Sequence, residues 1–383
     1  MPSALFVTTL PVTLEAFLLP FADHFRSEGW RVDALANGAA ADPRLDGHFD
    51  QRFDVRWSRN PLAPSNLLGT ARQVRRIVET GGYDIVHVHT PIAAFVTRYA
   101  LRSIRGRAGT PVVVYTAHGF HFYEGGAATP NLLYRTAERI AAGWTDYLVT
   151  INREDLAAAK DLRGIAADRI RYIPGIGVDT DRFSPDAVSA EQAATVRHDL
   201  GVPDDAFMLT MVAEFAPVKR HEHVLSALSR VKDDSVVLVL VGDGPLESPL
   251  RHTVAALGLA ERVRWAGYRR DLPAVFAASD ATILASEREG LNRSVLEAMA
   301  SGRPVIGTQT RGIADAVGPD AGWIAPKDDV DALARAIETA AADSEDRKRR
   351  GEAARRRALS DFVLPRIIEA YEELYREALA SRV

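Results

Sequence analysis

Short apolar runs alternate with helical patterns from one end of the chain to the other. In the first half, apolar runs predict strands at Ala4–Thr9, Arg31–Ala36, Asp84–His89, Pro111–Ala117, Asp146–Ile151 and Ile170–Pro174. In the second half, the corresponding runs are Phe207–Ala213, Ser235–Gly242, Arg262–Ala266, Ala281–Ala285 and Pro304–Gly307. The stretches between them predict helices at Leu14–Glu28, Leu67–Thr80, Ile92–Ile104, Asn131–Ala142, Glu222–Val231, Leu246–Leu257, Leu272–Ala278 and Val295–Ala300. Because strands and helices alternate, we expect an α/β protein with parallel sheets covered on both faces.

The number of predicted strands favours two domains. A single twisted sheet of about a dozen strands would be unusual, and 383 residues fit two domains of roughly 100–200 residues each. The turn-forming stretch from Gly175 to Asp186 separates the halves. We expect one doubly wound domain at residues 1–185, a second at residues 186–360, and a C-terminal helix within residues 361–383 that packs back on the N-terminal domain. That helix repeats apolar residues at 3–4 spacing, namely Ile367, Ile368, Tyr371, Leu374, Tyr375 and Ala378.

Composition narrows the function classes. The chain is 47% hydrophobic and 26% charged, which is ordinary for a globular protein with a sizeable core. It has no cysteine, which excludes disulfides, thiolate metal sites and cysteine nucleophiles. A net charge of −4 argues against a general nucleic-acid binder. The start of the chain lacks the pattern of a signal peptide and no apolar run reaches about 20 residues, so we expect a cytoplasmic protein.

Positive charge is concentrated between residues 70 and 110. Only Glu79 and Asp84 oppose it in this stretch. The basic residues are Arg72, Arg75, Arg76, Arg98, Arg102, Arg105 and Arg107. They fit either a solvated helix surface or a peripheral contact with anionic lipid head groups, where each cation contributes about 1 kcal/mol.

The strongest chemical signal runs from Ser286 to Pro304. It follows a predicted strand and opens a helix, for which Asn292 is a suitable N-cap. Free backbone N–H groups and the helix dipole at such a junction favour phosphate binding. Glu289 and Glu297 flank the junction, so their carboxylates can accept hydrogen bonds from hydroxyls on either side of a phosphate.

This stretch resembles the E-x7-E element of retaining glycosyltransferase family 4, with Glu289 and Glu297 as the two acids. The variant at residues 288–294, REGLNRS, resembles the subgroup associated with capsule and exopolysaccharide synthesis. Further similar segments, in the same order, are HVHTP at 87–91, TAHGFHFY at 116–123, IPGIGVD at 173–179 and GDGPL at 242–246. The resemblance covers most of the chain. It implies the GT-B fold, in which two Rossmann-like domains face a central cleft that holds the active site.

The resemblance assigns roles to the C-terminal domain. It implies that Glu289 binds donor-sugar hydroxyls, that Glu297 binds the nucleotide ribose, and that Lys219 and the amides of Gly290 and Leu291 face the diphosphate. Cations and amides placed there stabilise the charge that develops on a leaving nucleoside diphosphate.

The chain differs from the family at the position of the second cation that binds the diphosphate. Many family members carry an arginine upstream of the lysine, where this chain has Glu214. A carboxylate cannot bind phosphate, so we expect Arg293 or Arg220 to supply the charge.

Two loops of the second domain complete the expected donor site. The family places the glycine turn of Gly242 and Gly244 near the nucleotide, because glycine lets backbone approach a ligand. The loop that contains Tyr268 and Arg269 either flanks the base of the donor nucleotide or only connects a strand to the next helix.

In the N-terminal domain, His118 follows a predicted strand at its carboxyl end, where open α/β sheets place ligands. It resembles the family histidine close to the transferred sugar. His121, Phe122 and Tyr123 either shape an acceptor pocket or pack, and Thr9 lies in a first loop that lacks the family's glycines.

Other histidine pairs do not predict a metal site. His87 and His89 point to one face of a strand and are expected to line the sheet near the cleft. His221 and His223 lack an evident third ligand, so we expect no metal and no cofactor.

We therefore expect a metal-independent retaining transferase that uses a nucleotide-diphosphate sugar, with a UDP-sugar favoured, and a lipid-diphosphate-linked or growing bacterial glycan as acceptor. No carboxylate stands out as a nucleophile, which favours front-face attack assisted by a diphosphate oxygen. The alternatives are a sugar-nucleotide epimerase of similar fold, a transferase acting on soluble small molecules, and a non-catalytic nucleotide-sugar binder.

Overall fold

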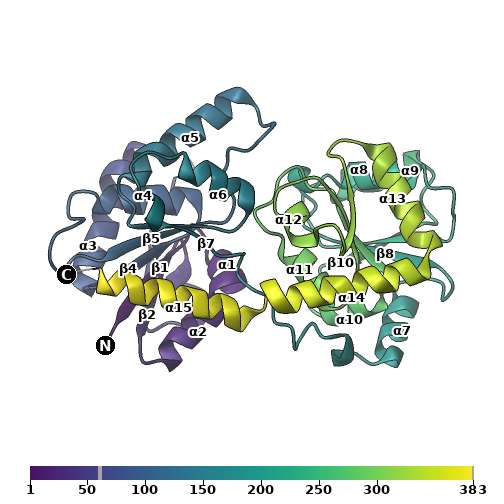
Figure 1. Ribbon diagram of the computed structural model, residues 1–383, viewed down its shortest axis with the longest axis horizontal. Coiled ribbons are helices and arrows are strands. Elements are labelled where there is room, and N and C mark those ends of the chain that lie inside the picture. The colour runs from purple at the N-terminus through teal and green to yellow at the C-terminus, as the bar shows by residue number, and fades with distance from the viewer. Residues whose placement is uncertain (59–62, 382–383) are drawn as a thin grey trace. The chain divides into compact units, whose positions relative to one another are not determined.

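The computed structural model describes residues 1–58 and 63–381. The chain divides into two compact units, each built around one parallel sheet (Figure 1). The first unit comprises Met1–Ile176 and the C-terminal residues from Pro365 onward, and the second comprises Gly177–Leu364.

The first unit contains a seven-stranded sheet in the order β3-β2-β1-β4-β5-β6-β7. Its strands are β1 (Ser3–Val7), β2 (Arg31–Ala36), β3 (Arg52–Asp54), β4 (Ile85–Val88), β5 (Val112–Ala117), β6 (Tyr147–Thr150) and β7 (Ile170–Tyr172). All paired strands are parallel. The central strands are buried on both faces, as expected for a sheet with helices on both sides.

The connections of the first unit are mainly helical. The α-helices are α1 (Pro11–Thr13), α2 (Leu19–Ser27), α3 (Ala71–Gly81), α4 (Pro91–Leu101), α5 (Ala128–Ala142), α6 (Arg153–Lys160) and the C-terminal α15 (Leu364–Ala380). π-Helical turns span Leu14–Leu18 and Ser65–Thr70, and 3-10 turns span Ala39–Ala41, Pro43–Leu45 and Ala167–Arg169.

The second unit contains a six-stranded parallel sheet in the order β10-β9-β8-β11-β12-β13. Its strands are β8 (Phe207–Val212), β9 (Val236–Val241), β10 (Val263–Gly267), β11 (Ala281–Leu284), β12 (Val305–Thr308) and β13 (Gly322–Ala325). Its helices are α7 (Ala190–Asp199), α8 (His221–Leu228), α9 (Glu247–Ala256), α10 (Leu272–Ala278), α11 (Arg293–Ala300), α12 (Ile313–Val317), α13 (Val330–Ala342) and α14 (Ser344–Asp361). 3-10 turns span Pro185–Ala187 and Pro217–Lys219.

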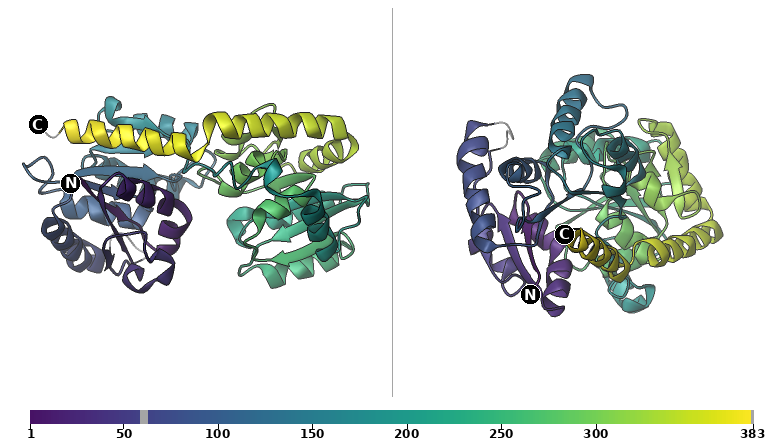
Figure 2. Two further views of the ribbon diagram at one scale, coloured as in Figure 1. Left: turned by 90° about the horizontal axis from the view of Figure 1, so that it is seen from below. Right: turned by 60° about the vertical axis from the view of Figure 1, so that its left-hand side comes forward.

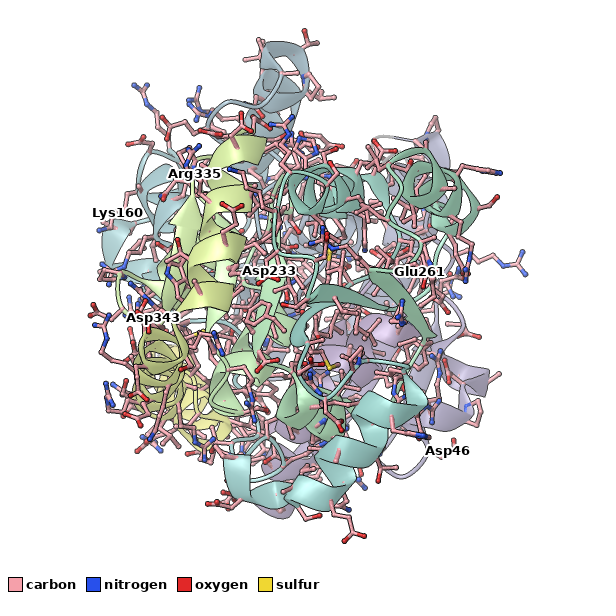
Figure 3. All side chains as sticks on the ribbon, turned by 90° about the vertical axis from the view of Figure 1, so that its right-hand side faces the viewer. Asp46, Lys160, Asp233, Glu261, Arg335 and Asp343 are labelled. Atoms are coloured by element: carbon pink, nitrogen blue, oxygen red, sulfur yellow. The ribbon has the colours of Figure 1, made fainter. Side chains whose placement is uncertain are left out.

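Alternate residues of β9 build two separate apolar layers. Leu238 and Leu240 pack with α8 and α13 on one face, whereas Val237 and Val239 pack with α7 and α10 on the other. Charged side chains such as Glu261, Arg335 and Asp343 lie on the outside of this unit (Figure 3). The two-faced core confirms the prediction of doubly wound sheets.

Two edge strands and the helices α6, α12, α13 and α14 lie outside the elements that the sequence pattern predicted. β3 and β13 contain only three and four residues and carry no long apolar run. The buried side of α14 consists of Gly351, Ala354 and Ala358, which are too small to produce an apolar stripe. A Cβ atom at Gly351 would lie 2.3 Å from the carbonyl oxygen of Gly302, so glycine permits this close approach.

The chain passes between the units at two neighbouring points. The amide of Val178 donates to the carbonyl of Phe362 (2.8 Å), and the amide of Leu364 donates to the carbonyl of Val178 (3.0 Å). Phe183 is buried in the core of the second unit. These contacts explain why residues 177–185, which we expected in the first domain, belong to the second unit.

The C-terminal helix α15 packs on the first unit (Figure 2). It buries Ile367, Ile368, Tyr371, Leu374, Tyr375 and Ala378, the residues that repeat at 3–4 spacing in the sequence. Within the described residues, no helix combines the length and the apolar character needed to cross a bilayer.

Candidate functional site

The loop between β11 and α11 carries the first glutamate of the pair. The side chain of Asn292 accepts a hydrogen bond from the amide of Val295 (3.1 Å), which confirms Asn292 as the N-cap of α11. Ser294 Oγ donates to the carbonyl of Val212 at the end of β8 (2.9 Å). The helix start is therefore anchored to the neighbouring strand.

Glu289 lies directly against Lys219. Lys219 Nζ is 2.7 Å from Glu289 Oε1, and the two side chains are 19% and 10% exposed. A backbone hydrogen bond from Glu287 to Val218 (2.8 Å) joins the same two loops. The structure thus brings together an acid and a cation from the carboxyl ends of adjacent strands, where open α/β sheets bind ligands.

Glu297 is the buried member of the pair of acids. It is 4% exposed, and burial raises the pKa of its carboxyl group, although Arg293 opposes this shift. Arg293 Nε donates to Glu297 Oε1 at 2.7 Å. A buried carboxylate with one exposed cationic partner can still accept hydrogen bonds from vicinal hydroxyls.

The two arginines that we expected near the diphosphate already have carboxylate partners. Arg293 pairs with Glu297, and Arg220 pairs with Asp328. Arg220 and Asp328 both adopt positive φ angles, of 52° and 69°. Glu214 is exposed, so water solvates the carboxylate that stands where the family has a cation.

The loop after β12 reaches the same site and was missed by sequence reasoning. Arg311 Nε donates to the carbonyl oxygen of Glu289 (3.1 Å), and Thr310 Oγ1 donates to that of Ser286 (2.9 Å). A Cβ atom at Gly312 would lie 2.2 Å from the carbonyl oxygen of Gly290. The sequence signal that could have identified this loop is the Arg-Gly pair at residues 311–312, which follows a predicted strand.

The glycine turn after β9 packs against the loop after β8. A Cβ atom at Gly242 would lie 2.1 Å from the carbonyl oxygen of Ala213, and one at Gly244 would lie 2.8 Å from the amide nitrogen of Phe215. Both positions also have positive φ angles. This packing requires glycine whether or not a ligand is present.

The remaining predicted donor residues occupy the loops at this edge of the sheet. Tyr268 is exposed, and Arg269 pairs with Asp271. Gly290 and Leu291 are partly buried, and Gly312 of the loop after β12 lies against both of them.

In the first unit, His118 belongs to a buried group of histidines. His118 Nε2 is 3.0 Å from His89 Nδ1, and the ring of Phe17 stacks on His118 with centroids 5.5 Å apart. Burial lowers the pKa of His118 to about 4, so the ring is neutral at pH 7. A neutral imidazole donates through one nitrogen and accepts through the other.

His87 connects this group to α15. Its Nδ1 atom is 2.5 Å from the hydroxyl of Tyr375 and its Nε2 atom is 2.8 Å from Thr116 Oγ1, which also contacts the hydroxyl of Tyr371 at 3.0 Å. Burial lowers the pKa of His87 to about 3. Among the described residues, no group of three or more histidine, aspartate or glutamate side chains is placed to hold a metal ion.

The predicted acceptor residues differ in their surroundings. Phe122 is 2% exposed and stacks on Phe120 with centroids 4.8 Å apart, which corrects its assignment from acceptor contact to core packing. His121 packs against Tyr134, and Tyr123 is partly buried. Thr9 is held by Thr90 through an O···O contact of 2.7 Å at the carboxyl ends of β1 and β4.

The arginine-rich stretch does not form a membrane patch as a whole. Arg98 is 1% exposed and pairs with Glu138 at 3.0 Å, so it cannot contact lipid. Arg75 pairs with Glu79, while Arg72, Arg76 and Arg102 are exposed.

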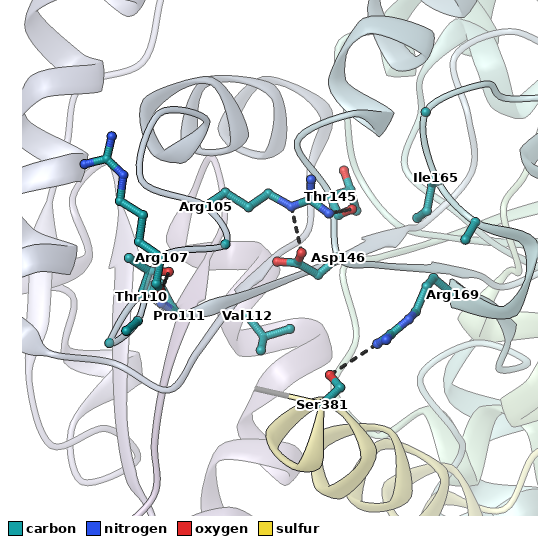
Figure 4. Close-up of a pocket in the computed structure, with 15 residues that line it drawn as sticks. Arg105, Arg107, Thr110, Pro111, Val112, Thr145, Asp146, Ile165, Arg169 and Ser381 are labelled. Atoms are coloured by element: carbon teal, nitrogen blue, oxygen red, sulfur yellow. Dashed lines mark hydrogen bonds and ion pairs between the residues drawn. The ribbon is translucent and has the colours of Figure 1, made fainter. Parts of the chain in front are cut away.

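Two further arginines of this stretch line a cavity of about 560 Å³ (Figure 4). They are Arg105, which pairs with Asp146 at 2.7 Å, and Arg107. The cavity lies at the amino ends of β5 and β6, and none of the predicted donor or acceptor residues lines it.

Known protein families match both halves of the chain. Residues 14–182 match the family model described as Glycosyltransferase Family 4, and residues 193–357 match the one described as Glycosyl transferases group 1. EpsD of Bacillus subtilis (strain 168), which is named as a glycosyltransferase, is 34% identical over 374 residues, covering 97% of this chain and 95% of the relative.

Two other similarities bear on chemistry and fold. A UDP-Gal:alpha-D-GlcNAc-diphosphoundecaprenol alpha-1,3-galactosyltransferase of Escherichia coli is 30% identical over 242 residues, or 62% of this chain and 60% of the relative. The crystal structure of Anabaena HepE in complex with UDP superimposes with a TM-score of 0.81 at 22% identity, over 98% of this chain and 100% of that one. This structural likeness shows the fold.

Proposed function

The chain belongs to glycosyltransferase family 4 and has the GT-B fold, and we propose that it transfers a sugar, with retention of anomeric configuration, from a UDP-sugar to a hydroxyl of a lipid-diphosphate-linked glycan. The observation that carries the proposal is the contact between Glu289 and Lys219 beside the start of α11. In this proposal Glu289 binds the sugar hydroxyls and the neighbouring Lys219 binds the diphosphate.

The chemistry follows from this arrangement. Cleavage of the bond between the sugar and the diphosphate leaves negative charge on the diphosphate. Lys219 and the backbone amides of Gly290 and Leu291 would stabilise that charge without reorganisation at the moment of reaction. Glu289 would orient the sugar, and Glu297 would bind the ribose hydroxyls.

Retention requires that the acceptor hydroxyl attack from the face that the diphosphate leaves. In this proposal a diphosphate oxygen accepts the proton of the acceptor hydroxyl as the new glycosidic bond forms. His118 is neutral, and it would donate a hydrogen bond to the sugar or accept one from it.

The names of similar proteins support the donor and the acceptor. The Escherichia coli relative is named for transfer from UDP-Gal to a diphosphoundecaprenol-linked sugar, and HepE was crystallised with UDP. A UDP-sugar and a polyprenyl-diphosphate sugar are therefore the first substrates to test.

The test is a panel of UDP-, GDP-, ADP- and dTDP-sugars, assayed for stabilisation of the protein and for transfer to polyprenyl-diphosphate sugars. We expect one UDP-sugar to stabilise the wild-type protein and to react, and the product to keep the donor's anomeric configuration by NMR. Glu289→Gln should lower turnover by about 100-fold or more. Glu222→Gln, which changes an exposed carboxylate on α8, should leave turnover unchanged.

Each result that contradicts these expectations would exclude a different part of the proposal. An inverted product would exclude the front-face mechanism, and isomerisation of the donor without an acceptor would show an epimerase. Transfer to soluble acceptors with no preference for the polyprenyl carrier would exclude the lipid-linked acceptor. Near-normal turnover by Glu289→Gln would remove Glu289 from the site.

Helix α5 suits contact with an anionic membrane, where a polyprenyl acceptor would reside. It projects from the first unit in Figures 1 and 2. Leu132, Leu133 and Ile140 are 69%, 58% and 51% exposed, and Arg135 and Arg139 are exposed on the adjoining side of the helix. Apolar side chains with flanking arginines are typical of helices that lie in the lipid interface.

Vesicle sedimentation tests this surface. The wild-type protein should bind vesicles of phosphatidylcholine with phosphatidylglycerol more tightly than pure phosphatidylcholine. Leu132→Ser/Leu133→Ser and Arg135→Gln/Arg139→Gln should each weaken binding by roughly tenfold. Leu257→Ser, an exposed leucine of the second unit, is the control. Equal binding by all variants would exclude α5, and a lipid-free dimer disrupted by the leucine changes would make it a self-association surface.

A further inference from the structure

His89 and His118 share one hydrogen bond just after the carboxyl ends of β4 and β5. His89 Nδ1 lies 3.0 Å from His118 Nε2, which is hydrogen-bond distance. Burial lowers the pKa of His118 to about 4 and holds that of His89 well below its ordinary value. Both rings are therefore neutral at pH 7, so one of the two facing nitrogens donates a proton and the other accepts it.

The surroundings of the other nitrogen of His89 indicate which ring donates. His89 is 1% exposed, and its Nε2 atom is buried with no hydrogen-bond partner among the described residues. The cavity that His89 lines measures about 10 Å³, the lower limit for one water molecule, and its lining is mostly apolar. The hydroxyls of Tyr371 and Tyr375 on that lining already bond Thr116 and His87. A proton on His89 Nε2 would therefore lack a good acceptor.

The two possible proton arrangements differ in cost. If His118 donates, His89 keeps its own proton on Nε2 and buries an N–H group. The ring of Phe6 lies against His89, with centroids 6.2 Å apart, but an aromatic face is a weak acceptor. If His89 donates, its Nε2 atom carries only an unused lone pair. Buried N–H groups without a partner are rarer in proteins than acceptors with an unused lone pair, so donation by His89 is favoured.

Donation by His89 also determines what His118 offers to a ligand. With Nε2 accepting, the single proton of the neutral His118 ring is on Nδ1. His118 Nδ1 bonds no protein group in the part of the chain that the structure describes, and it is not one of the buried polar atoms that lack a partner, so it is accessible. The ring of Phe17 stacks on His118 and supports this orientation. His118 then presents an N–H donor, and no acceptor, at this edge of the sheet.

We propose that His89 is a positioning residue: by donating Nδ1–H to His118 Nε2, it holds His118 in the tautomer that presents Nδ1–H as a hydrogen-bond donor. This inference rests on the proposed function and narrows it, because His118 would donate to a hydroxyl oxygen of the transferred sugar. In this tautomer His118 cannot take the proton of the acceptor hydroxyl, which agrees with a diphosphate oxygen as the proton acceptor.

The tautomer of His118 is read directly by ¹⁵N NMR of the histidine-labelled full chain at pH 7, without donor or acceptor. The His118 signals are identified by their loss in His118→Gln. In the wild-type protein we expect the Nδ1–H form in roughly tenfold excess over the Nε2–H form, since one hydrogen bond favours it. An excess of the Nε2–H form, or similar amounts of both, would overturn the proposal.

Substitutions of two adjacent buried histidines separate positioning from support of the fold. His87 is 3% exposed and bonds Thr116 and Tyr375, whereas His89 bonds His118. His89→Leu should allow a large population of the Nε2–H form, and His87→Leu should leave the tautomer of His118 unchanged. His89→Asn keeps an N–H donor near the position of Nδ1 and should retain the Nδ1–H form. If the two leucine variants change the tautomer alike, His89 only supports the fold and the proposal is wrong. If His89→Leu does not fold, the wild-type spectrum and His89→Asn still decide.

Turnover connects the tautomer to the proposed reaction. With the UDP-sugar and acceptor identified by the panel, His89→Leu should lower kcat by roughly tenfold, and His89→Asn should recover most of it. An altered tautomer with normal kcat in His89→Leu would overturn the role of this donor in transfer. If wild type transfers sugar but shows the Nε2–H form, this inference fails while the proposed function stands. If wild type shows the Nδ1–H form but transfers sugar from no donor, the proposed function fails, and only the assignment of the tautomer is supported.

Discussion

At the scale of single residues, Glu297 shows how a binding group can cost stability. Its carboxylate is buried and its pKa is raised, so the ionised form is less stable in the folded protein than in water. The contribution of such a group to folding is most favourable below its ordinary pKa near 4.5 and is lost as the pH rises through the raised value.

Glu297→Gln should therefore stabilise the free protein at pH 7.5 while weakening donor binding. We expect a gain of about 1 kcal/mol in the free energy of unfolding and a roughly tenfold loss of UDP affinity. Thermal unfolding and calorimetric titration measure the two effects. The gain should shrink at pH 4; an equal gain at both pH values would mean that ionisation of Glu297 is not its source.

At the scale of elements, the crossing between the units depends on a close backbone approach. Gly177 has a φ of 78°, and a Cβ atom there would lie 2.6 Å from the Cα atom of Leu364. Backbone atoms cannot move aside as the end of a flexible side chain can. The start of α15 is therefore fixed by a glycine far away in the sequence.

Gly177→Ala should cost about 3 kcal/mol of stability, compared with about 1 kcal/mol for Gly82→Ala. Gly82 has a φ of 59° but nothing within 4 Å of the added Cβ atom. Gly82→Ala therefore measures only the cost of placing alanine in a left-handed backbone conformation, without a steric clash. Denaturant unfolding of both variants gives the difference. Equal losses would contradict the steric argument.

The contact between α4 and α5 depends on a buried ion pair. Arg98 is 1% exposed, pairs with Glu138, and stacks on the ring of Tyr115 with its Cζ atom 4.1 Å from the centroid. Removal of one member leaves a mostly buried charge without its partner.

Arg98→Met should destabilise the protein by about 3–5 kcal/mol, and Arg98→Met/Glu138→Met should recover much of that loss. Exposed Arg102 provides the control, because Arg102→Met should change stability by less than about 1 kcal/mol. Urea unfolding of the four proteins completes the comparison. A double variant no more stable than Arg98→Met would show that packing, and not the unpaired carboxylate, causes the loss.

At the scale of the whole molecule, the buried histidines make stability depend on pH. Burial lowers the pKa of His87 to about 3 and that of His118 to about 4, whereas an unfolded histidine titrates near 6.5. Below pH 6.5 the unfolded chain binds protons that the folded chain does not. The stabilising contribution of these groups is therefore present above pH 6.5 and is lost as the pH falls toward 4 and 3.

The melting temperature should thus decrease between pH 7 and pH 5. His87→Phe should reduce the slope of unfolding free energy against pH by up to about 1.4 kcal/mol per pH unit, the value for one proton. His198→Gln should leave the slope unchanged, since the His198 side chain is 90% exposed. Calorimetry at several pH values checks this. An unchanged slope in His87→Phe would contradict the assignment of a lowered pKa to His87.

The features that the sequence by itself determined are those that depend on residues close together in the chain. The alternation of strands and helices, the N-cap at Asn292 and the apolar stripe of α15 depend on neighbouring residues, and the structure confirms them. The motif residues Glu289 and Glu297 were also recognisable, because a strand, a loop and a helix start lie within one short segment.

Only the tertiary structure decided which distant side chains meet. It paired Lys219 with Glu289 and His87 with Tyr375, buried Arg98, and placed Arg311 on the carbonyl of Glu289. Periodicity states which face of an element is apolar, but not which element covers that face. These contacts arise from the order of strands in a sheet and the packing of helices on it, and both are set by burial of the whole core.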